Sequence, residues 1–232
     1  MKIISWNCNG ALRKKYNSLE RFNADLWIIQ ECENPSESTK AFKEWASNYL
    51  WLGENKNRGI GIFAFSDIKL EKLPWNDNNL QSFLPCKVNG SLNLIAVWTK
   101  HAKSPNFRYI GQLWKYMQLH KKKMKNAPFI LVGDWNSNTC WDEWDRWWNH
   151  SDVVKELNDL GAYSIYHQFY NEEQGKESRP TLYHLRNRKK PYHVDYAFIS
   201  KQLLDKNDIY IGDADEWLEF SDHMPLVFSI NN

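Results

Sequence analysis

Asp134 and Asn136 are residues whose types and spacing could do chemistry. They lie two residues apart in the stretch GDWNSN, directly after the apolar run Phe129 to Val132, whose composition predicts a buried strand. A carboxylate at the end of a buried strand loses hydration, and a partner must offset that cost. Two interpretations remain open at this point: the pair either caps a turn or faces a bound cation.

Polar side chains also stand at the ends of the other predicted strands. These carboxylates, carboxamides and histidines are Asn7, Asn9, Glu31, His101, Asp195, Asp222 and His223. If two sheets bring the strand ends together, the carboxylates repel one another unless a cation or a proton joins them. Oxygen ligands without cysteine favour Mg²⁺ or Mn²⁺ over zinc. The alternative interpretation is that these residues are ordinary solvated side chains. This interpretation fits Asp195 least well, because Asp195 interrupts an apolar segment.

The composition excludes several classes of protein. In 232 residues, 30 Lys and Arg nearly balance 28 Asp and Glu, so the chain lacks the basic excess of many nucleic-acid binders. The four cysteines have no spacing typical of a zinc site or a disulfide framework. The N-terminal apolar run is too short for a signal peptide, and no segment approaches about 18 consecutive apolar residues. We expect a soluble, cytoplasmic protein that contacts no membrane and has no evident obligate protein partner.

Apolar patterning predicts the elements that position these residues. Strands are expected over 2–6, 26–29, 58–65, 92–99, 129–132, 194–199 and 225–230, and helices near 16–22, over 107–125 and near 153–160. Strands alternate with helices early in the chain and cluster later. This order predicts an α/β fold, a two-sheet β-sandwich of mixed strands flanked by helices in four layers (α/β/β/α), built as a single domain over residues 1–232.

Five motifs, in order, resemble those of the endonuclease/exonuclease/phosphatase superfamily of metal-dependent phosphoesterases. They are MKIISWNCNGALRK, LWIIQE, GDWNSN, HVDYAFIS and SDHMPL, and they span nearly the whole chain. The first motif is most similar to the exonuclease III and abasic-site endonuclease branch. His101 departs from that branch, which carries a tyrosine in this region, and is similar to the deoxyribonuclease I branch. The resemblance implies hydrolysis of phosphodiester bonds by a chain with a two-sheet sandwich fold.

The resemblance also implies a metal site and a group that acts on water. Glu31 is expected to hold Mg²⁺ or Mn²⁺, with help from Asn9 and Asp222. Asp134 is expected to orient or deprotonate the attacking water. A bound cation would relieve the charge on the phosphate oxygens during this reaction.

Further roles follow from the same resemblance. Asn7 and Asn136 are expected to hydrogen-bond the phosphate and its surroundings. Asp195 is expected to hold His223 in one tautomer, leaving His223 against the phosphate as a base or an electrostatic stabiliser. His101 is expected to protonate the leaving oxygen or to contact the phosphate.

DNA is the predicted substrate. The first motif belongs with the nuclease branch, the chain is short, and the basic stretch LRNRKK precedes the predicted strand with Asp195. Arg58, Arg186 and Arg188 are the predicted substrate-binding cations. Two alternatives stay open: a phosphoesterase acting on small phosphate esters or phospholipid head groups, and an inactive relative that only binds a partner.

The most unusual stretch is CWDEWDRWWNHS, residues 140–151. Trp141, Trp144 and Trp148 recur at i, i+3 and i+7, which predicts one helical face packed into the core. Trp147 then lies outside this face. It is the predicted exposed aromatic that stacks on the substrate.

Overall fold

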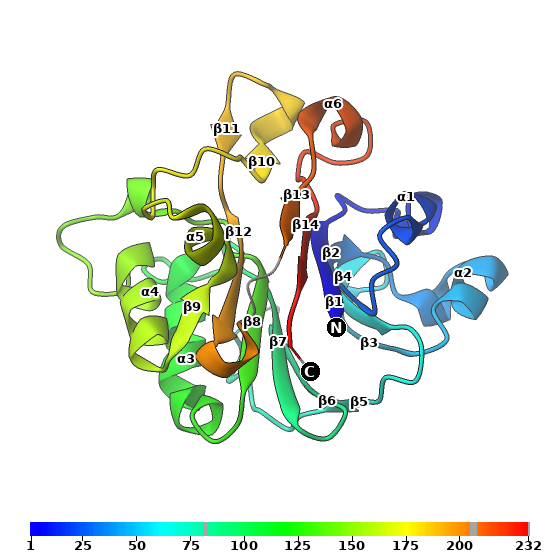
Figure 1. Cartoon of the computed structure of the whole chain (residues 1–232), viewed down its shortest axis with the longest axis horizontal. Helices are drawn as coiled ribbons and strands as arrows, with labels where there is room; N and C mark the ends of the chain where they lie inside the picture. The colour runs from blue at the N-terminus through cyan, green and yellow to red at the C-terminus, as the bar shows by residue number, and fades with distance from the viewer. Residues whose placement is uncertain (81–82, 205–207, 232) are drawn as a thin grey trace.

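The computed structural model describes residues 1–80, 83–204 and 208–231, and its first sheet carries both chain ends (Figure 1). The strands of this sheet, in spatial order, are β13 (Ile209–Ile211), β14 (Leu226–Ser229), β1 (Lys2–Asn7), β2 (Leu26–Cys32), β4 (Arg58–Ala64) and β3 (Tyr49–Asn55). β1 and β2 are parallel, and the other neighbours are antiparallel. The sheet is therefore mixed.

The second sheet has the same number of strands and a similar mixture of directions. In spatial order they are β5 (Leu70–Lys72), β6 (Phe83–Val88), β7 (Leu92–Trp98), β8 (Phe129–Asp134), β12 (Asp195–Ser200) and β9 (Ala162–Ser164). Only β7 and β8 are parallel neighbours among these described strands. A separate two-stranded hairpin consists of β10 (Leu182–Tyr183) and β11 (Pro191–Tyr192).

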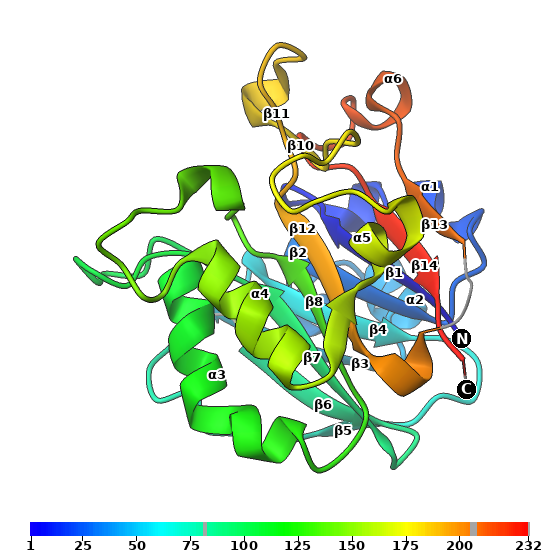
Figure 2. The same ribbon diagram turned by 60° about the vertical axis from the view of Figure 1, so that its left-hand side comes forward.

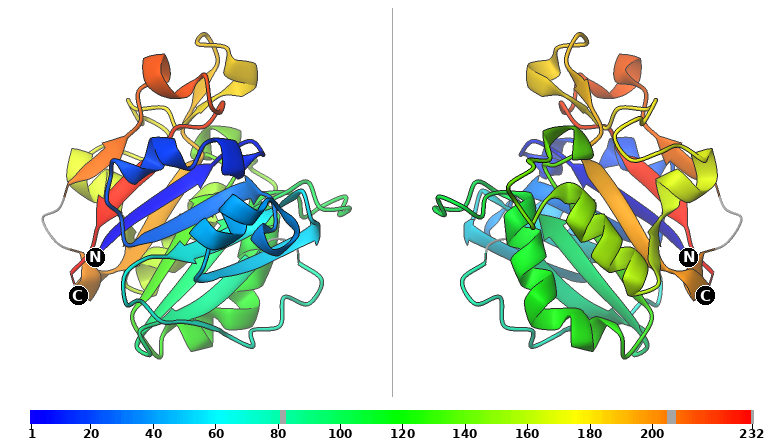
Figure 3. Two further views of the ribbon diagram at one scale, coloured as in Figure 1. Left: turned by 90° about the vertical axis from the view of Figure 1, so that its right-hand side faces the viewer. Right: turned by 90° about the vertical axis from the view of Figure 1, so that its left-hand side faces the viewer.

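Six α-helices occur in the described residues. They are α1 (Asn17–Glu20), α2 (Lys40–Trp45), α3 (Ile110–Met124), α4 (His150–Asp159), α5 (Ile165–Tyr170) and α6 (Ala214–Trp217). Figure 3 shows α1 and α2 over the outer face of the first sheet and α3 with α4 over the outer face of the second. The predicted four-layer arrangement of helices and sheets is confirmed. None of these helices has the length and apolar character needed to cross a membrane.

The two-residue period of the strands explains why both faces of each sheet are buried. In β2, Ile28 points into the core between the sheets, while Trp27 packs against the helices of the outer layer. In β8, Val132 points into the same core and Leu131 packs under α3 and α4. Strands covered on both faces are continuously apolar, which is why these runs are visible in the sequence.

The prediction of a helix through residues 141–148 is wrong. A short 3₁₀ turn covers Thr139–Trp141, and α4 begins only at His150. The carboxylate of Asp142 accepts hydrogen bonds from the backbone N–H groups of His150 (2.8 Å) and Ser151 (3.1 Å), and Asn149 forms a capping box with Asp152. These caps start the helix after the tryptophans.

Candidate active site

The carboxylate of Asp134 lies at the end of β8, where both sheets open to one mouth. Asp134 pairs with Trp98 of β7 and with Asp195 of β12. The preceding Gly133 has φ +142°, and a Cβ atom there would stand 1.9 Å from the carbonyl oxygen of Val97. Only glycine fits this approach of β7 to β8, so the G-D pair of the motif reflects the backbone as well as the carboxylate.

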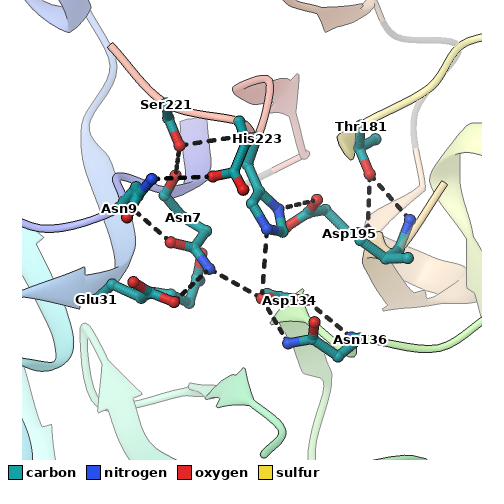
Figure 4. Close-up of polar contacts among 12 residues, drawn as sticks. Asn7, Asn9, Glu31, Asp134, Asn136, Thr181, Asp195, Ser221 and His223 are labelled. Atoms are coloured by element: carbon teal, nitrogen blue, oxygen red, sulfur yellow. Dashed lines mark hydrogen bonds and ion pairs between the residues drawn. The ribbon is translucent and has the colours of Figure 1, made fainter. Parts of the chain in front are cut away.

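Asp134 is completely buried and accepts three hydrogen bonds (Figure 4). The Asn7 side chain donates to Oδ2 at 2.9 Å; the side chain and the backbone N–H of Asn136 donate to Oδ2 and Oδ1, both at 2.8 Å. Burial and the charge of Asp195 raise the pKa of Asp134 to about 7, against the opposing effect of His223 and the amide donors. The hydrogen bond from the backbone N–H of Asn136 is the turn cap that the sequence analysis left open beside a bound cation.

His223 and Asp195 form a buried pair next to this carboxylate. Nδ1 of His223 lies 2.9 Å from Oδ2 of Asp195, and Nε2 lies 3.9 Å from Oδ2 of Asp134. Burial alone would lower the pKa of His223, but the charges of Asp195 and Asp134 raise it to about 10. At neutral pH, His223 therefore carries a positive charge that faces Asp134.

Three further residues hold this pair, and the sequence analysis assigned none of them a role. Thr181 Oγ1 accepts the backbone N–H of Asp195 at 3.0 Å, and the Trp6 indole donates to the carbonyl of His223 at 2.9 Å. Ser221 Oγ donates to the carbonyl of Asn7 at 2.7 Å and accepts the N–H of His223. Trp6 and Ser221 lie inside the quoted motifs, but nothing local marks Thr181, which reaches the site through tertiary structure.

A second polar group, centred on Glu31, lines the outer part of the mouth. Asn7 Nδ2 lies 3.3 Å from Oε1 of Glu31, and the guanidinium of Arg58 lies 2.5 Å from Oε2. Asn9 bridges this group to the C-terminal motif, because its side chain donates to Asp222 at 3.2 Å and accepts from Arg58. Glu31 has φ +62° at an irregularity between β2 and β4, a conformation that is costly for a glutamate and common at functional sites.

The chemistry of these residues fits a divalent cation at Glu31. Carboxylate and carboxamide oxygens suit a hard cation, and the guanidinium between Glu31 and Asn9 shows that positive charge is favourable there. Asp134, Asp195 and His223 also each offer one potential ligand atom, and these three atoms lie within 4.8 Å of one another. A cation there would compete with the hydrogen bond between His223 and Asp195, whereas a cation at Glu31 would replace the guanidinium of Arg58 among oxygen ligands, so the Glu31 group fits better.

The remaining predicted residues have other partners in the described part of the chain. His101 is exposed, its ring is 6.1 Å from that of Tyr109, and in the described part of the chain it is outside the network around Asp134. Arg186 donates to the carbonyls of residues 219 and 220, and Arg188 pairs with Asp215 at 2.5 Å. Trp147 is 65% exposed and packs edge-on against Trp148.

The fold and this site together define a class of proteins. Two mixed sheets place a buried aspartate, a histidine–aspartate pair and an outer carboxylate group at one mouth, as hydrolases of phosphate esters require. A model described as the Endonuclease/Exonuclease/phosphatase family matches residues 4–223. The chain belongs to this family and is a metal-dependent phosphoesterase, which confirms the resemblance seen in its five motifs.

Solved structures share the fold at low sequence identity. An AP endonuclease from Archaeoglobus fulgidus is 18% identical with a TM-score of 0.72, and a 3'-5' exonuclease (NExo) from Neisseria meningitidis is 20% identical with a TM-score of 0.72; in both comparisons, 100% of each chain is covered. The catalytic domain of Xenopus laevis APE2 is 18% identical with a TM-score of 0.66, over 99% of this chain and 91% of that one. No curated protein sequence matches the chain.

Proposed function

We propose that the chain is a DNA nuclease, a Mg²⁺- or Mn²⁺-dependent phosphodiesterase that acts as one domain over residues 1–232. The observation that carries this proposal is the buried carboxylate of Asp134, held by Asn7 and Asn136 beside the charged His223. A protein that only binds a partner gains nothing from burying a carboxylate at this cost. The arrangement suits a hydrolase that positions water next to a phosphate.

Each residue of the network has a proposed role. Asp134 orients and deprotonates the attacking water, because a base works best when its pKa is near the operating pH. Asn7 and Asn136 hold the water and the phosphate without adding negative charge. His223, oriented by Asp195, stabilises the charge that develops on the phosphate oxygens.

The outer group supplies the remaining parts. Glu31, with Asn9 and Asp222, would hold the divalent cation, which when bound neutralises charge on the phosphate and the leaving oxygen. Arg58 neutralises a phosphate oxygen from the same side of the mouth. His101, exposed after the end of β7, contacts the phosphate or protonates the leaving oxygen.

Two observations support DNA as the substrate. One solved structure with this fold is a 3' phosphatase, NExo, from Neisseria bound to product DNA hairpin, at 18% identity and a TM-score of 0.69. In this chain, Arg186 and Arg188 belong to the segment between β10 and β11. Leu182 of β10 forms a β-bridge with His223, which connects this hairpin to the site. We propose that these arginines bind backbone phosphates and that Trp147 stacks on the nucleic acid.

A panel of substrates tests the function. The protein is incubated with Mg²⁺, Mn²⁺ or EDTA and supercoiled plasmid, labelled duplexes with and without an abasic site, single-stranded DNA, RNA and bis-p-nitrophenyl phosphate. We expect metal-dependent cleavage of DNA, and a loss of about 10² or more in rate for Glu31→Ala and for His223→Ala. Glu71→Ala, an exposed carboxylate on β5, serves as the control that stays active.

The same panel can refute the proposal. Full activity in a folded Glu31→Ala or His223→Ala variant would contradict the site. Hydrolysis of the small diester alone would keep the site but remove DNA as the substrate, and would favour small phosphate esters or phospholipid head groups. Circular dichroism and the unfolding midpoint show whether each variant is folded.

A further inference from the structure

A wide hollow continues outward from Asn136, and none of the roles above uses it. Its volume is about 880 Å³, and it lies between the loop that precedes α3 and the segment that joins β8 to α4. Figure 2 shows these two segments reaching outward on the same side of the molecule. Asn136 and Ser137 line its inner end, so the hollow shares a wall with the candidate active site. Its volume is typical of pockets for small ligands.

Three aromatic rings, those of Tyr109, Trp141 and Trp148, contribute to the wall of this hollow. Tyr109 and Trp141 line it and are 40% and 43% exposed, although aromatic side chains of this size gain from burial. Trp148 also lines it and is fixed from behind by Phe107, with ring centroids 4.6 Å apart. A Cβ atom at Gly111 would stand 3.1 Å from Trp148, so a glycine there allows the close packing. The rings therefore present a prepared stacking surface.

The backbone of Tyr109 adds a second observation. Its φ of +48° with ψ of −113° is unfavourable for a tyrosine, and it places this ring at the start of α3 beside the hollow. Strain of this kind is found where a side chain must be presented for function. The backbone N–H of Tyr109 donates to the carbonyl of Lys100 at 2.8 Å, which holds the residue in place.

The charges in the lining select among possible ligands. Asp142, Glu143 and Asp145 contribute three carboxylates to the lining, and Arg108 and Arg146 contribute two guanidinium groups. Arg146 is paired with Glu143 at 2.9 Å. A lining with more carboxylates than guanidinium groups disfavours a row of phosphates. Asp142 caps α4 and Glu143 pairs with Arg146, so Asp145 is the carboxylate that can accept hydrogen bonds from the amino group of a neutral aromatic ring, which describes a nucleobase.

We propose that this hollow binds an unpaired nucleobase of the substrate strand, stacked against Trp141 and Tyr109. The proposal rests on the proposed function, because the wall shared with Asn136 places the base next to the phosphate at the site. A base inside a duplex cannot reach the hollow without leaving its stack. The protein should therefore prefer single-stranded, frayed or extruded nucleotides to fully paired ones.

Binding of short oligonucleotides in EDTA tests the hollow without cleavage. The two probes are a fluorescein-labelled dC hexamer and a hexamer of abasic tetrahydrofuran phosphates, which has the same backbone charge and no bases. We expect the wild type to bind the dC hexamer about 10-fold more tightly, because each stacked base contributes to affinity. Trp141→Ala should remove most of this preference, and Trp141→Phe should retain most of it.

Trp144→Ala is the matched control, because this side chain is 96% exposed and lies outside the lining among the described residues. It should keep the preference of the wild type. Equal binding of the two hexamers by the wild type, an unchanged preference in Trp141→Ala, or an equal loss in Trp144→Ala would each overturn the proposal. Separate hydrolysis assays of the wild type with Mg²⁺ distinguish failure of the proposed function from failure of the base-binding proposal. The absence of metal-dependent hydrolysis would refute the proposed function. Hydrolysis without a preference for the dC hexamer in binding would refute only the proposed role of the hollow.

Discussion

At the scale of single residues, the site depends on opposite charges that are buried together. Asp134, Asp195 and His223 are almost inaccessible to water, so the two carboxylates are stabilised mainly by the positive charge of His223, which lies between them, and Asp134 also by the amide donors of Asn7 and Asn136. Removing one partner leaves another charge uncompensated. Changes at these three positions should therefore alter both the chemistry and the stability of the protein.

The pairing of His223 predicts a pH dependence of stability in EDTA. The pKa of His223 is about 10 in the folded protein and about 6.5 for an unperturbed histidine. A histidine whose pKa rises on folding stabilises the fold below its unfolded value and loses that contribution as pH rises through its folded value. We expect the free energy of unfolding to fall between about pH 7 and pH 10, and to fall less steeply in Asp195→Asn.

Urea denaturation across this pH range measures the effect. Asp215→Asn is the control, because this carboxylate is at the surface and pairs only with the exposed Arg188 among the ion pairs described. Identical pH profiles for the wild type and Asp195→Asn would show that Asp195 does not hold the proton on His223.

At the scale of secondary structure elements, the ends of the strands matter more than their lengths. β8 carries Gly133 and Asp134 to the point where β7 and β12 flank them, and the backbone there is too close for any side chain at Gly133. The bulge in β2 turns Glu31 toward the mouth in a similar way. Local departures from regular strand geometry therefore place the two key carboxylates.

Replacing Gly133 by alanine should be strongly destabilising. The new Cβ would collide with the carbonyl of Val97, and the φ of +142° is unfavourable for alanine, so we expect a loss of about 3 kcal/mol or more in the free energy of unfolding. Gly90→Ala is the control: Gly90 has φ +73° with nothing within 4 Å of the added atom, so a loss of about 1 kcal/mol is expected. If urea denaturation gives the same loss of unfolding free energy for Gly133→Ala and Gly90→Ala, the close approach of Gly133 to the carbonyl of Val97 is contradicted.

The elements also show which sequence patterns predict secondary structure and which do not. Runs such as Phe129 to Val132 were predicted correctly because strands buried on both faces are continuously apolar. β3 was missed, because its residues are half-buried or exposed and show no alternation. The spacing of the tryptophans suggested a helix, but the caps at Asp142 and Asn149 decide where α4 begins, and helical spacing alone does not account for caps.

At the scale of the whole molecule, the site exists only because two sheets are packed together. Asn7 ends a strand of the first sheet, and its side chain reaches Asp134 in the second sheet. The five motifs made the fold predictable, since each marks a strand end at the same mouth. The hydrogen bonds of Thr181 and the pairing of Arg58 with Glu31 depend on residues distant in sequence, so patterns within single segments could not predict them.

A divalent cation should stabilise the whole fold. Glu31 lies in β2, Asn9 follows β1 and Asp222 precedes β14, so the folding of the first sheet brings these residues together, and a cation bound to them favours the folded protein by mass action. At a concentration 100 times Kd, we expect Mg²⁺ to raise the unfolding midpoint by roughly 5 to 10 °C. Glu31→Gln should lose most of this shift, whereas Glu71→Gln should keep it. A shift that NaCl reproduces at equal ionic strength would count against a specific site.

The distribution of cysteines has a practical consequence. Cys8, Cys32 and Cys86 are buried, whereas Cys140 is exposed and directly precedes Trp141 in the wall of the hollow. Burial and the charge of Glu177 raise the pKa of the Cys140 thiol, but this thiol is accessible, whereas burial raises the pKa of Cys8 and of Cys86 to about 12. A maleimide dye would therefore attach preferentially at Cys140 in the folded protein without any cysteine being removed. The molecule thus carries a ready attachment point for an optical sensor that reports, by a change in emission, when a nucleotide enters the hollow.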